Sequence, residues 1–305
     1  MNRNAPILAL VAVGLVLLLA ASLVGILGDD RGSPYAFTSL RGESVEIYGG
    51  QGLYQHDSVS KAILFRGFDW ANLFVCLPLL AWGVVLQRRG HLRGQLLVAS
   101  VFAYLAYNYL IGVMGNAFNI LFLVWTGLLS VGVFGLAFAL AGIDISAIPG
   151  QMKGGFPRRS LSIYMIILGL FLVVQYMSEI LTAYRTGSPP ASLGIYTTLE
   201  LAALELAIMI PLHASGAILL WRKRPLGYLL GVILVFTAFM TFVSLAAASL
   251  ISYFVYGRGS VLDVAIPVVL TVIAAGFSAA VFIHVGDHRV RETTVEQAHR
   301  VDGER

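Results

Sequence analysis

Several side chains that can carry charge or form hydrogen bonds lie inside long apolar stretches of this sequence. The most deeply placed carboxylate is Glu205, within "LELAALELAIMIPLHASGAILLWRKR", residues 199–224. An ionised group inside hydrocarbon costs about 2.5–3.5 kcal/mol on insertion scales, so such a residue usually faces the interior of a helix bundle or a wet cavity. Six residues in such stretches are the predicted solute-binding residues: Glu205, Glu179, Asn72, Asn108, Gln175 and Asp69.

The spacing of these residues favours binding over an assignable reaction. Gln175 and Glu179 are four residues apart and share a helix face. Glu205 and His213 are eight residues apart, about 80° around an α-helix and about 12 Å along it, so we expect no direct bond between them. No spacing of His, Cys, Asp and Glu matches a metal site, and no histidine pair is placed to hold a haem. We therefore expect neither a metal nor a cofactor, and no catalytic residue is assigned.

A structural role is the alternative for several of the polar residues. Asp69, Glu200 and Asp263 lie near the ends of their apolar stretches, where helix capping or snorkelling explains a carboxylate. His213 is expected to be a hydrogen-bonded core histidine. Asn108, which tyrosines flank, is expected to join helices.

The elements that must position these side chains are membrane-spanning helices. The chain is 58% hydrophobic and 12% charged, whereas soluble domains are about 45–50% apolar and about 25% charged. Runs of about 20 apolar residues match a helix that crosses a hydrocarbon core about 30 Å thick. The first run is too long for a signal peptide and is kept as a helix. Eight spans are predicted, at about 6–27, 68–87, 95–114, 119–142, 161–183, 199–221, 227–256 and 261–285.

The positions of Lys and Arg predict that both termini face the cytoplasm. With that orientation, 14 of the 20 Lys and Arg residues fall in cytoplasmic segments and six fall outside. Basic residues near the ends of spans are held on the cytoplasmic side, so this orientation is favoured. The net charge of +4 arises from these short clusters, and we therefore expect no nucleic-acid partner.

One long segment, residues 28–67, is expected outside the cytoplasm. "SVEIYGGQGLYQH" alternates apolar and polar residues on both sides of a glycine-rich turn, which predicts a short hairpin. Asp57 or Ser58 is expected to cap a helix with an apolar stripe at Val59, Ala62 and Ile63, lying in the membrane interface. The motif "GGQG" lacks the Lys-Ser/Thr pair of a phosphate-binding loop.

The sequence contains an internal match at an offset of 133 residues. Residues 77–97 align without gaps to residues 210–230, with nine identities in 21 positions. The matched unit is a helix, a basic turn and the next helix, and four spans precede the second copy, so two four-helix halves would enter the membrane in the same sense. The same offset pairs Asn72 with Glu205. We predict an all-α membrane protein of two parallel repeats, with divisions at 1–150, 151–285 and a cytoplasmic tail at 286–305.

Three stretches resemble a family of bacterial multi-spanning membrane proteins of unknown function. They are "RGFDWANLF" with Pro78 downstream, "YLAYNYLIGVMGNAFNILFL", and "LELAIMIP" followed by "RKRPLGYLL". The resemblance covers both halves and implies no activity. It implies Asp at the position where this chain carries Glu205, which keeps the charge. It also implies the cytoplasmic membrane of a bacterial cell as the location, with the lipid bilayer as a partner.

The sequence leaves three functions open. The first is a transport or sensing protein that binds a small cation or polar solute in an outward-facing vestibule. The second is an intramembrane enzyme acting on a lipid or lipid-linked substrate, with Asp29, Asp30, Asp69 or Glu205 as acid, base or metal ligand. The third is an accessory subunit whose partner is another membrane protein or a second copy of the chain.

Overall fold

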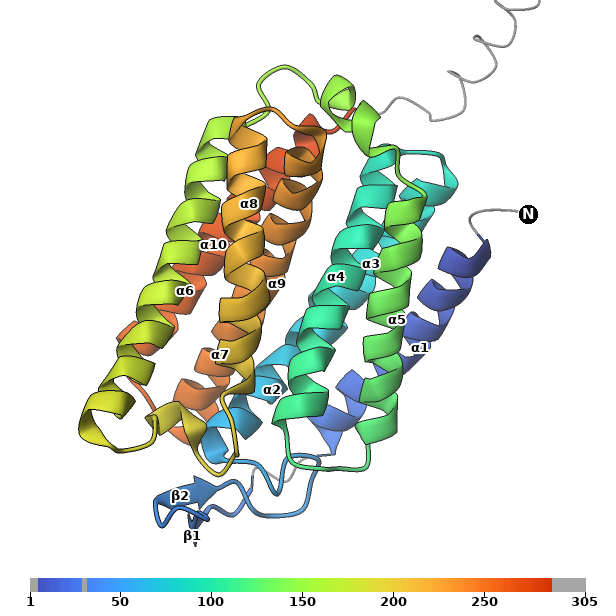
Figure 1. Cartoon of the computed structure of the whole chain (residues 1–305). Coiled ribbons are helices and arrows are strands. Elements are labelled where there is room, and N and C mark those ends of the chain that lie inside the picture. Colours follow the sequence, from blue (N-terminus) through green and yellow to red (C-terminus); the bar gives the residue numbers. More distant parts are fainter. Residues whose placement is uncertain (1–4, 29–31, 287–305) are drawn as a thin grey trace, which may run out of the picture.

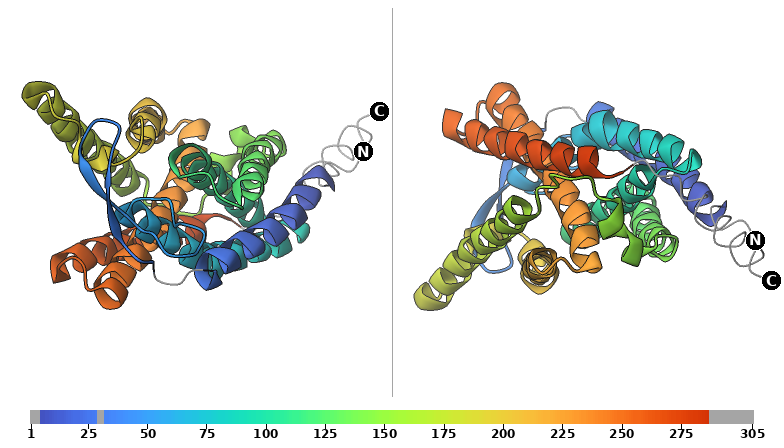
Figure 2. Two further views of the ribbon diagram at one scale, coloured as in Figure 1. Left: turned by 90° about the horizontal axis from the view of Figure 1, so that it is seen from below. Right: turned by 90° about the horizontal axis from the view of Figure 1, so that it is seen from above.

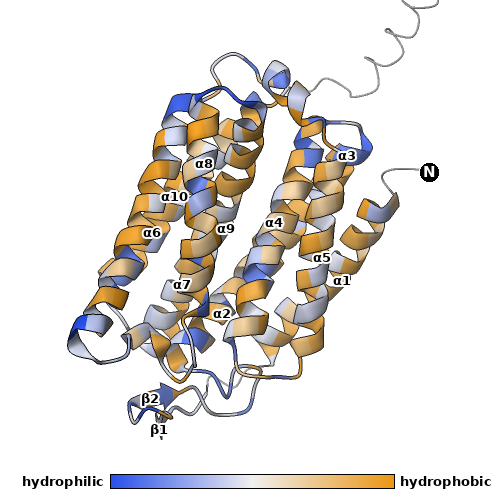
Figure 3. Ribbon diagram, viewed as in Figure 1, coloured by the Kyte–Doolittle hydropathy of each residue, from blue (hydrophilic) through white to orange (hydrophobic). Residues whose placement is uncertain are grey.

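The computed structural model describes residues 5–28 and 32–286 of the 305-residue chain. Within them, eight helices are long and apolar enough to cross a membrane, as the sequence predicts. They form a bundle with a two-stranded hairpin at one end (Figure 1), and hydrophobic residues dominate their length (Figure 3). The chain is therefore that of a multi-pass membrane protein. Asp29, Asp30 and residues 287–305 of the predicted tail lie outside the described residues.

Two of the eight spans are each built from two α-helices joined by a π turn. The second span is α2, η1 and α3, and the sixth is α7, η4 and α8. The helices are α1 (Ala5–Leu27), α2 (Val59–Ala71), α3 (Leu77–Arg88), α4 (Leu92–Gly115), α5 (Phe122–Ala141), α6 (Arg158–Thr186), α7 (Glu200–Leu204), α8 (Ile210–Trp221), α9 (Pro225–Tyr256) and α10 (Val261–His284). The π turns are η1 (Asn72–Cys76) and η4 (Glu205–Met209), and two short 3-10 turns are η2 (Ile145–Gln151) and η3 (Ala191–Leu193).

The predicted interfacial helix is part of the second span instead of a separate element. Ser58 caps α2, since its side chain accepts a hydrogen bond from the Lys61 amide. Val59 and Ile63 are buried against Ala248 of α9. The apolar stripe therefore packs against a helix of the bundle, and α2 continues into the second span.

The hairpin exists, but its strands pair differently from the prediction. Strand β2 (Ser44–Ile47) pairs antiparallel with the preceding strand β1 (Tyr35–Thr38), and not across the "GGQG" turn. Gly42, with φ of +92°, lies in the connection between the two strands. The glycine-rich segment instead turns the chain back toward α2, because the Tyr48 amide donates to the Asp57 carbonyl at 2.9 Å.

Helices α4 and α9 form the centre of the bundle. In the most apolar windows of these two spans 78% and 72% of residues are buried, more than in the other six candidate spans. Viewed along the bundle, the other helices surround this pair (Figure 2). Helix α2 inclines across the centre and packs closely on α9 at Gly67, where an added Cβ would overlap the Ser244 carbonyl oxygen. Helices α2, α4 and α9 therefore meet at the centre of the bundle.

Several local features recur at the 133-residue offset. The π turns begin at Asn72 and Glu205. Gly90 and Lys223 both have positive φ, in the turns that follow α3 and α8. A Cβ at Gly94 would overlap the Gln87 amide nitrogen, and one at Gly227 would overlap the Leu220 amide nitrogen. We call the end that carries these two turns the basic end, and the opposite end, which carries β1 and β2, the hairpin end.

Candidate functional site

Asn72 belongs to a filled hydrogen-bond network in the centre of the bundle. The Tyr104 hydroxyl of α4 donates to Asn72 Oδ1 at 2.9 Å and lies 3.3 Å from Ser244 Oγ of α9. Asn72 Nδ2 donates to the Tyr109 hydroxyl oxygen at 3.5 Å. These side chains are all within the bundle, since Asn72 and Tyr104 are 1% and 0% exposed. The network joins the second span to α4 and α9.

Asp69 lies in a second network near the hairpin end. The Tyr54 hydroxyl donates to its Oδ2 at 2.6 Å, and both side chains are buried. Gly25 of α1 packs so closely on this carboxyl group that a Cβ there would overlap Oδ2. Asp69 therefore connects the segment before α2 to α1.

Glu205 lines a cavity of about 170 Å³ that lies between α2, α4, α6, α9 and the sixth span. The Tyr107 hydroxyl of α4 donates to Glu205 Oε1, and neither Lys nor Arg pairs with this carboxyl group in the described part of the chain. We call this space the Glu205 cavity. Its remaining polar lining residues are Gln175, Tyr176, His213, Thr237 and Thr241, and the rest of the wall is apolar.

The π turn places Glu205 and His213 on nearly the same side of the sixth span. A π turn accommodates one extra residue, so the eight residues between them count as seven and the angle falls from about 80° to about 20°. Both residues consequently line one cavity. The sequence predicts no direct bond between Glu205 and His213. Among the described residues, no hydrogen bond joins these two side chains.

The imidazole of His213 presents a hydrogen-bond acceptor to the Glu205 cavity. Its Nδ1 lies 2.8 Å from the Met209 carbonyl oxygen, which can only accept, so Nδ1 carries the proton. In the neutral ring Nε2 is then an acceptor. Nε2 is buried and has no hydrogen-bond partner among the described residues. The side chain is thus the hydrogen-bonded core histidine that the sequence predicts, with one nitrogen still available.

The polar groups of the cavity have mostly used their donors. The Thr237 and Thr241 hydroxyls donate to the carbonyls of Ile233 and Thr237, each at 2.9 Å. Tyr107 donates to Glu205. What these groups leave toward the cavity are acceptors, namely the carboxyl of Glu205, Nε2 of His213 and the threonine oxygens. The Gln175 amide and the Tyr176 hydroxyl, which also line the cavity, can donate as well as accept. The acceptor set is complementary to a ligand that brings N–H donors.

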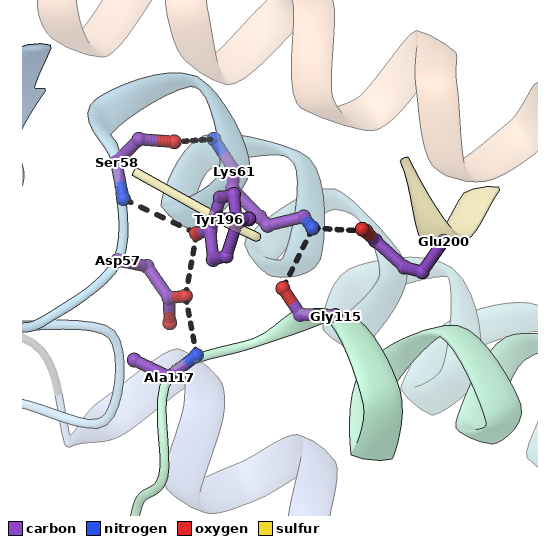
Figure 4. Close-up of polar contacts among 7 residues, drawn as sticks. All are labelled: Asp57, Ser58, Lys61, Gly115, Ala117, Tyr196 and Glu200. Atoms are coloured by element: carbon purple, nitrogen blue, oxygen red, sulfur yellow. Dashed lines mark hydrogen bonds and ion pairs between the residues drawn. The ribbon is translucent and has the colours of Figure 1, made fainter. Parts of the chain in front are cut away.

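Polar contacts join a cluster of loop and helix residues (Figure 4). Two of its members, Lys61 and Glu200, closely precede the cavity-lining residues Leu64 and Leu201 in the sequence. The Lys61 ammonium pairs with Glu200, donates to the Gly115 carbonyl at 2.6 Å and lies 3.9 Å from the centre of the Tyr196 ring. The Tyr196 hydroxyl donates to Asp57 Oδ1 at 2.8 Å. We call this set the end cluster. It joins α2 to the segments that precede α5 and α7.

Asp57 makes the stability of the end cluster depend on pH. Burial raises the pKa of the Asp57 carboxyl from its ordinary 3.8 to about 6, although Ala117, Tyr196, Lys61 and His56 lower it. The folded state therefore binds the Asp57 proton more tightly than the unfolded state, so this contribution is complete below about pH 3.8 and is lost as the pH rises through about 6. Its size is at most about 3 kcal/mol.

We expect Asp57→Asn to remove this pH dependence. The substituted amide keeps an oxygen for the Ala117 amide and the Tyr196 hydroxyl, which donate to Asp57 Oδ1 at 2.8 Å, and it carries no charge. The thermal midpoint of the variant should exceed that of the wild type at pH 7 and approach it at pH 4. Measurement of both midpoints in mild detergent across this range tests the assignment, and a constant difference between the two proteins would contradict it.

The other predicted residues lie in different surroundings. Gln175 lines the Glu205 cavity, at an exposed position of α6. Glu179, one turn further along α6, accepts a hydrogen bond from the Ser192 amide at 2.8 Å. Asn108 is buried in α4, and its Oδ1 has no partner among the described residues. The structure thus places Glu205 and Gln175 together, and Asn72, Asp69, Asn108 and Glu179 apart from them.

Five polar residues that line the Glu205 cavity are absent from the solute-binding set that the sequence predicts: Tyr107, Tyr176, His213, Thr237 and Thr241. For Tyr107 the sequence predicts only a contribution to helix contacts. It makes no prediction for Tyr176, Thr237 and Thr241. For Thr237 the sequence contains a signal, because the 133-residue offset that pairs Glu205 with Asn72 also pairs Thr237 with Tyr104. Within the described residues, no three His, Cys, Asp or Glu side chains form a group that could hold a metal ion.

Comparison of the chain with protein-family models, with curated proteins and with solved structures finds no significant match. The geometry of the site is therefore the basis for the functional proposal.

Proposed function

We propose that this protein binds a small organic cation with N–H donors, such as a compact ammonium compound, in the Glu205 cavity, as the binding step of transport or sensing. The observation that carries the proposal is that, among the described residues, Glu205 has no Lys or Arg partner and His213 Nε2, in the same cavity, has no hydrogen bond. A buried carboxylate without a counter-charge is costly. A bound ammonium group supplies both the missing charge and the missing donors.

The walls of the cavity suit the apolar part of such a cation. Phe68, Phe171 and Phe242 line it together with aliphatic side chains. Aromatic faces attract cations, by about 0.5–2 kcal/mol each depending on burial. A cavity of about 150 Å³ holds a benzene molecule in an engineered protein interior, so about 170 Å³ limits the ligand to a compact molecule such as benzylammonium.

The access route that fits this geometry passes α6. Phe171 and Gln175 both line the cavity and are exposed on the surface of the bundle. Toward the hairpin end, Lys61 lies about one turn before Leu64 and its partner Glu200 directly precedes Leu201, and both leucines line the cavity. We propose that opening of this pair connects the cavity to the outward-facing side, and that the orientation is the one with both termini in the cytoplasm.

The 133-residue offset relates the Glu205 cavity to a filled place beside Asn72. In the first half, Tyr104 fills the space beside Asn72 and bonds to it. At the equivalent places, 133 residues on, the smaller Thr237 lies in the same cavity wall as Glu205. Likewise Leu80, fully buried, corresponds to His213. Support for the two-repeat fold comes from the π turns and close glycine contacts at the same offset.

The test is equilibrium binding of a graded series, from methylammonium to benzylammonium, to the purified full chain in nanodiscs. We expect the amines to bind and the neutral analogues toluene and benzyl alcohol to bind more weakly. Glu205→Gln keeps an oxygen that accepts from Tyr107 but removes the charge. It should weaken amine binding roughly 10- to 100-fold, the range for a hydrogen bond to a charged group.

Glu179→Gln is the matched control, because the same chemical change occurs on a carboxylate that bonds to the Ser192 amide outside the cavity. Its affinity for amines should stay within about twofold of the wild type, since a distant surface charge is screened by salt. Equal losses in the two variants, or equal binding of amines and their neutral analogues, would refute the proposed site.

A further inference from the structure

The carboxyl group of Glu205 is buried without a charged partner. The residue is only 6% exposed, and no Lys or Arg pairs with it in the described part of the chain. The Tyr107 hydroxyl donates to Oε1, and no described residue donates a hydrogen bond to Oε2. An ionised carboxylate in such a place is costly, whereas the neutral carboxyl group costs much less. A proton on Oε2 therefore removes the charge of the empty cavity and keeps the bond from Tyr107.

The walls of the Glu205 cavity supply no fixed positive charge to replace that proton. Among the described lining residues, only Glu205 and His213 carry groups that can change charge between about pH 4 and 8. Both belong to the sixth span, and α2 and α9 add no ionisable side chain to the wall. The other polar groups of the wall, from α4, α6 and α9, are Tyr107, Gln175, Tyr176, Thr237 and Thr241. Toward the hairpin end, Lys61 of α2 is paired with Glu200. A charge on Glu205 is therefore compensated by what enters the cavity.

His213 is the alternative place for the proton. A proton on its Nε2 would make the cavity neutral as an imidazolium–carboxylate pair. No hydrogen bond joins the side chains of His213 and Glu205 among the described residues. That pair would leave two separate buried charges, which cost more than a neutral imidazole and a neutral carboxyl group. The carboxyl group is thus the better site for the proton.

We propose that cation binding in the Glu205 cavity is coupled to the release of one proton, which leaves Oε2 of Glu205 for the solvent as the ammonium group arrives. The O–H bond breaks, its electron pair stays on Oε2, and the carboxylate becomes the counter-ion of the ammonium group. The cavity is neutral in both states, so a proton and a cation exclude one another. The exchange rests on the proposed function and names its coupling ion. One cation exchanges for one proton without net charge movement, so a proton gradient can drive the cation across the membrane.

The first test is infrared difference spectroscopy of the full chain in nanodiscs at about pH 6, with and without saturating benzylammonium. We expect binding to the wild type to remove a carboxylic acid C=O band and to add a carboxylate band. Glu205→Gln should show neither change. Glu179→Gln should show both, because this carboxylate accepts from the Ser192 amide outside the cavity. Equal spectra of the wild type with and without the ligand would contradict the exchange.

The second test counts the protons by calorimetry in buffers of different ionisation enthalpy. The wild type should release about one proton per cation, and its affinity should rise up to about tenfold per pH unit. Glu205→Gln should bind weakly without release. His213→Asn keeps an acceptor oxygen but cannot take up a proton, so it should bind more weakly and still release about one proton.

The outcomes separate the exchange from the proposed function. Amine binding that depends on Glu205 but releases no proton would overturn the exchange and leave the proposed function intact. Release that persists in Glu205→Gln and is lost in His213→Asn would also overturn it, because the histidine would then hold the proton. Absence of amine binding would refute the proposed function, and the exchange with it.

Discussion

Thr237→Tyr is expected to abolish binding of small cations while leaving the protein folded. Thr237 lines the Glu205 cavity, and the added phenol ring would occupy the space that the ligand needs. The first half shows that this packing is feasible, because Tyr104, at the equivalent position, is fully buried and bonds to Asn72 at 2.9 Å. The new hydroxyl would be able to donate to Glu205 as Tyr104 does to Asn72. We expect affinity to fall at least about 1,000-fold, below detection in a titration, because a filled cavity excludes the ligand outright.

Thr237→Val is the matched control for this substitution. It removes the hydroxyl that bonds to the Ile233 carbonyl but keeps the size of the side chain, so the cavity stays open. Its affinity should stay within about tenfold of the wild type, since one neutral hydrogen bond is worth about 1 kcal/mol. The thermal midpoints of both variants should confirm folding. Undiminished binding by folded Thr237→Tyr would show that the ligand lies elsewhere.

Gly94→Ala is expected to destabilise the fold by about 3 kcal/mol, at the upper end of the range for overpacking. The added Cβ would overlap the Gln87 amide nitrogen and lie 2.5 Å from the Leu86 carbonyl carbon. Both are backbone atoms of α3, which cannot move aside as a flexible side chain does. Gly227→Ala should have a similar effect, because its Cβ would overlap the Leu220 amide nitrogen. The measurement is the thermal midpoint in mild detergent.

Gly276→Ala makes the same chemical change as Gly94→Ala, but we expect it to stabilise the fold slightly. Gly276 lies in α10, where an added Cβ would meet no heavy atom within 4 Å, and alanine favours a helix over glycine by about 1 kcal/mol in an exposed interior position. The midpoint should therefore rise slightly. If Gly94→Ala failed to lower the midpoint relative to Gly276→Ala, the close contact between α3 and α4 would be contradicted.

The spans could be predicted because hydrophobicity and length determine them directly. All eight predicted runs correspond to a helix, with starting residues that differ by up to about nine positions, at the second span. That span begins at Val59 because Val59 and Ile63 pack on α9, a contact between residues about 190 positions apart. The pairing of β2 with β1 is likewise decided by contacts that local alternation does not specify.

The candidate site was harder to predict, because its geometry depends on the π turn at Glu205–Met209. Counting by 3.6 residues per turn separates Glu205 from His213, and the extra residue of the π turn brings them to one side. Asn72 and Glu205 look equivalent in the sequence because the 133-residue offset pairs them. They differ because Tyr104 fills the space beside Asn72, whereas Thr237 leaves room beside Glu205.

Cation binding at Glu205 is tested most directly by a pair of experimental density maps of the full chain, with and without saturating benzylammonium. We expect difference density in the Glu205 cavity, with the ammonium nitrogen within hydrogen-bond distance of the Glu205 carboxylate and His213 Nε2, and the ring against Phe242. An unchanged cavity at saturation, or ligand density only outside it, would contradict the central claim that Glu205 is the counter-ion of a bound cation.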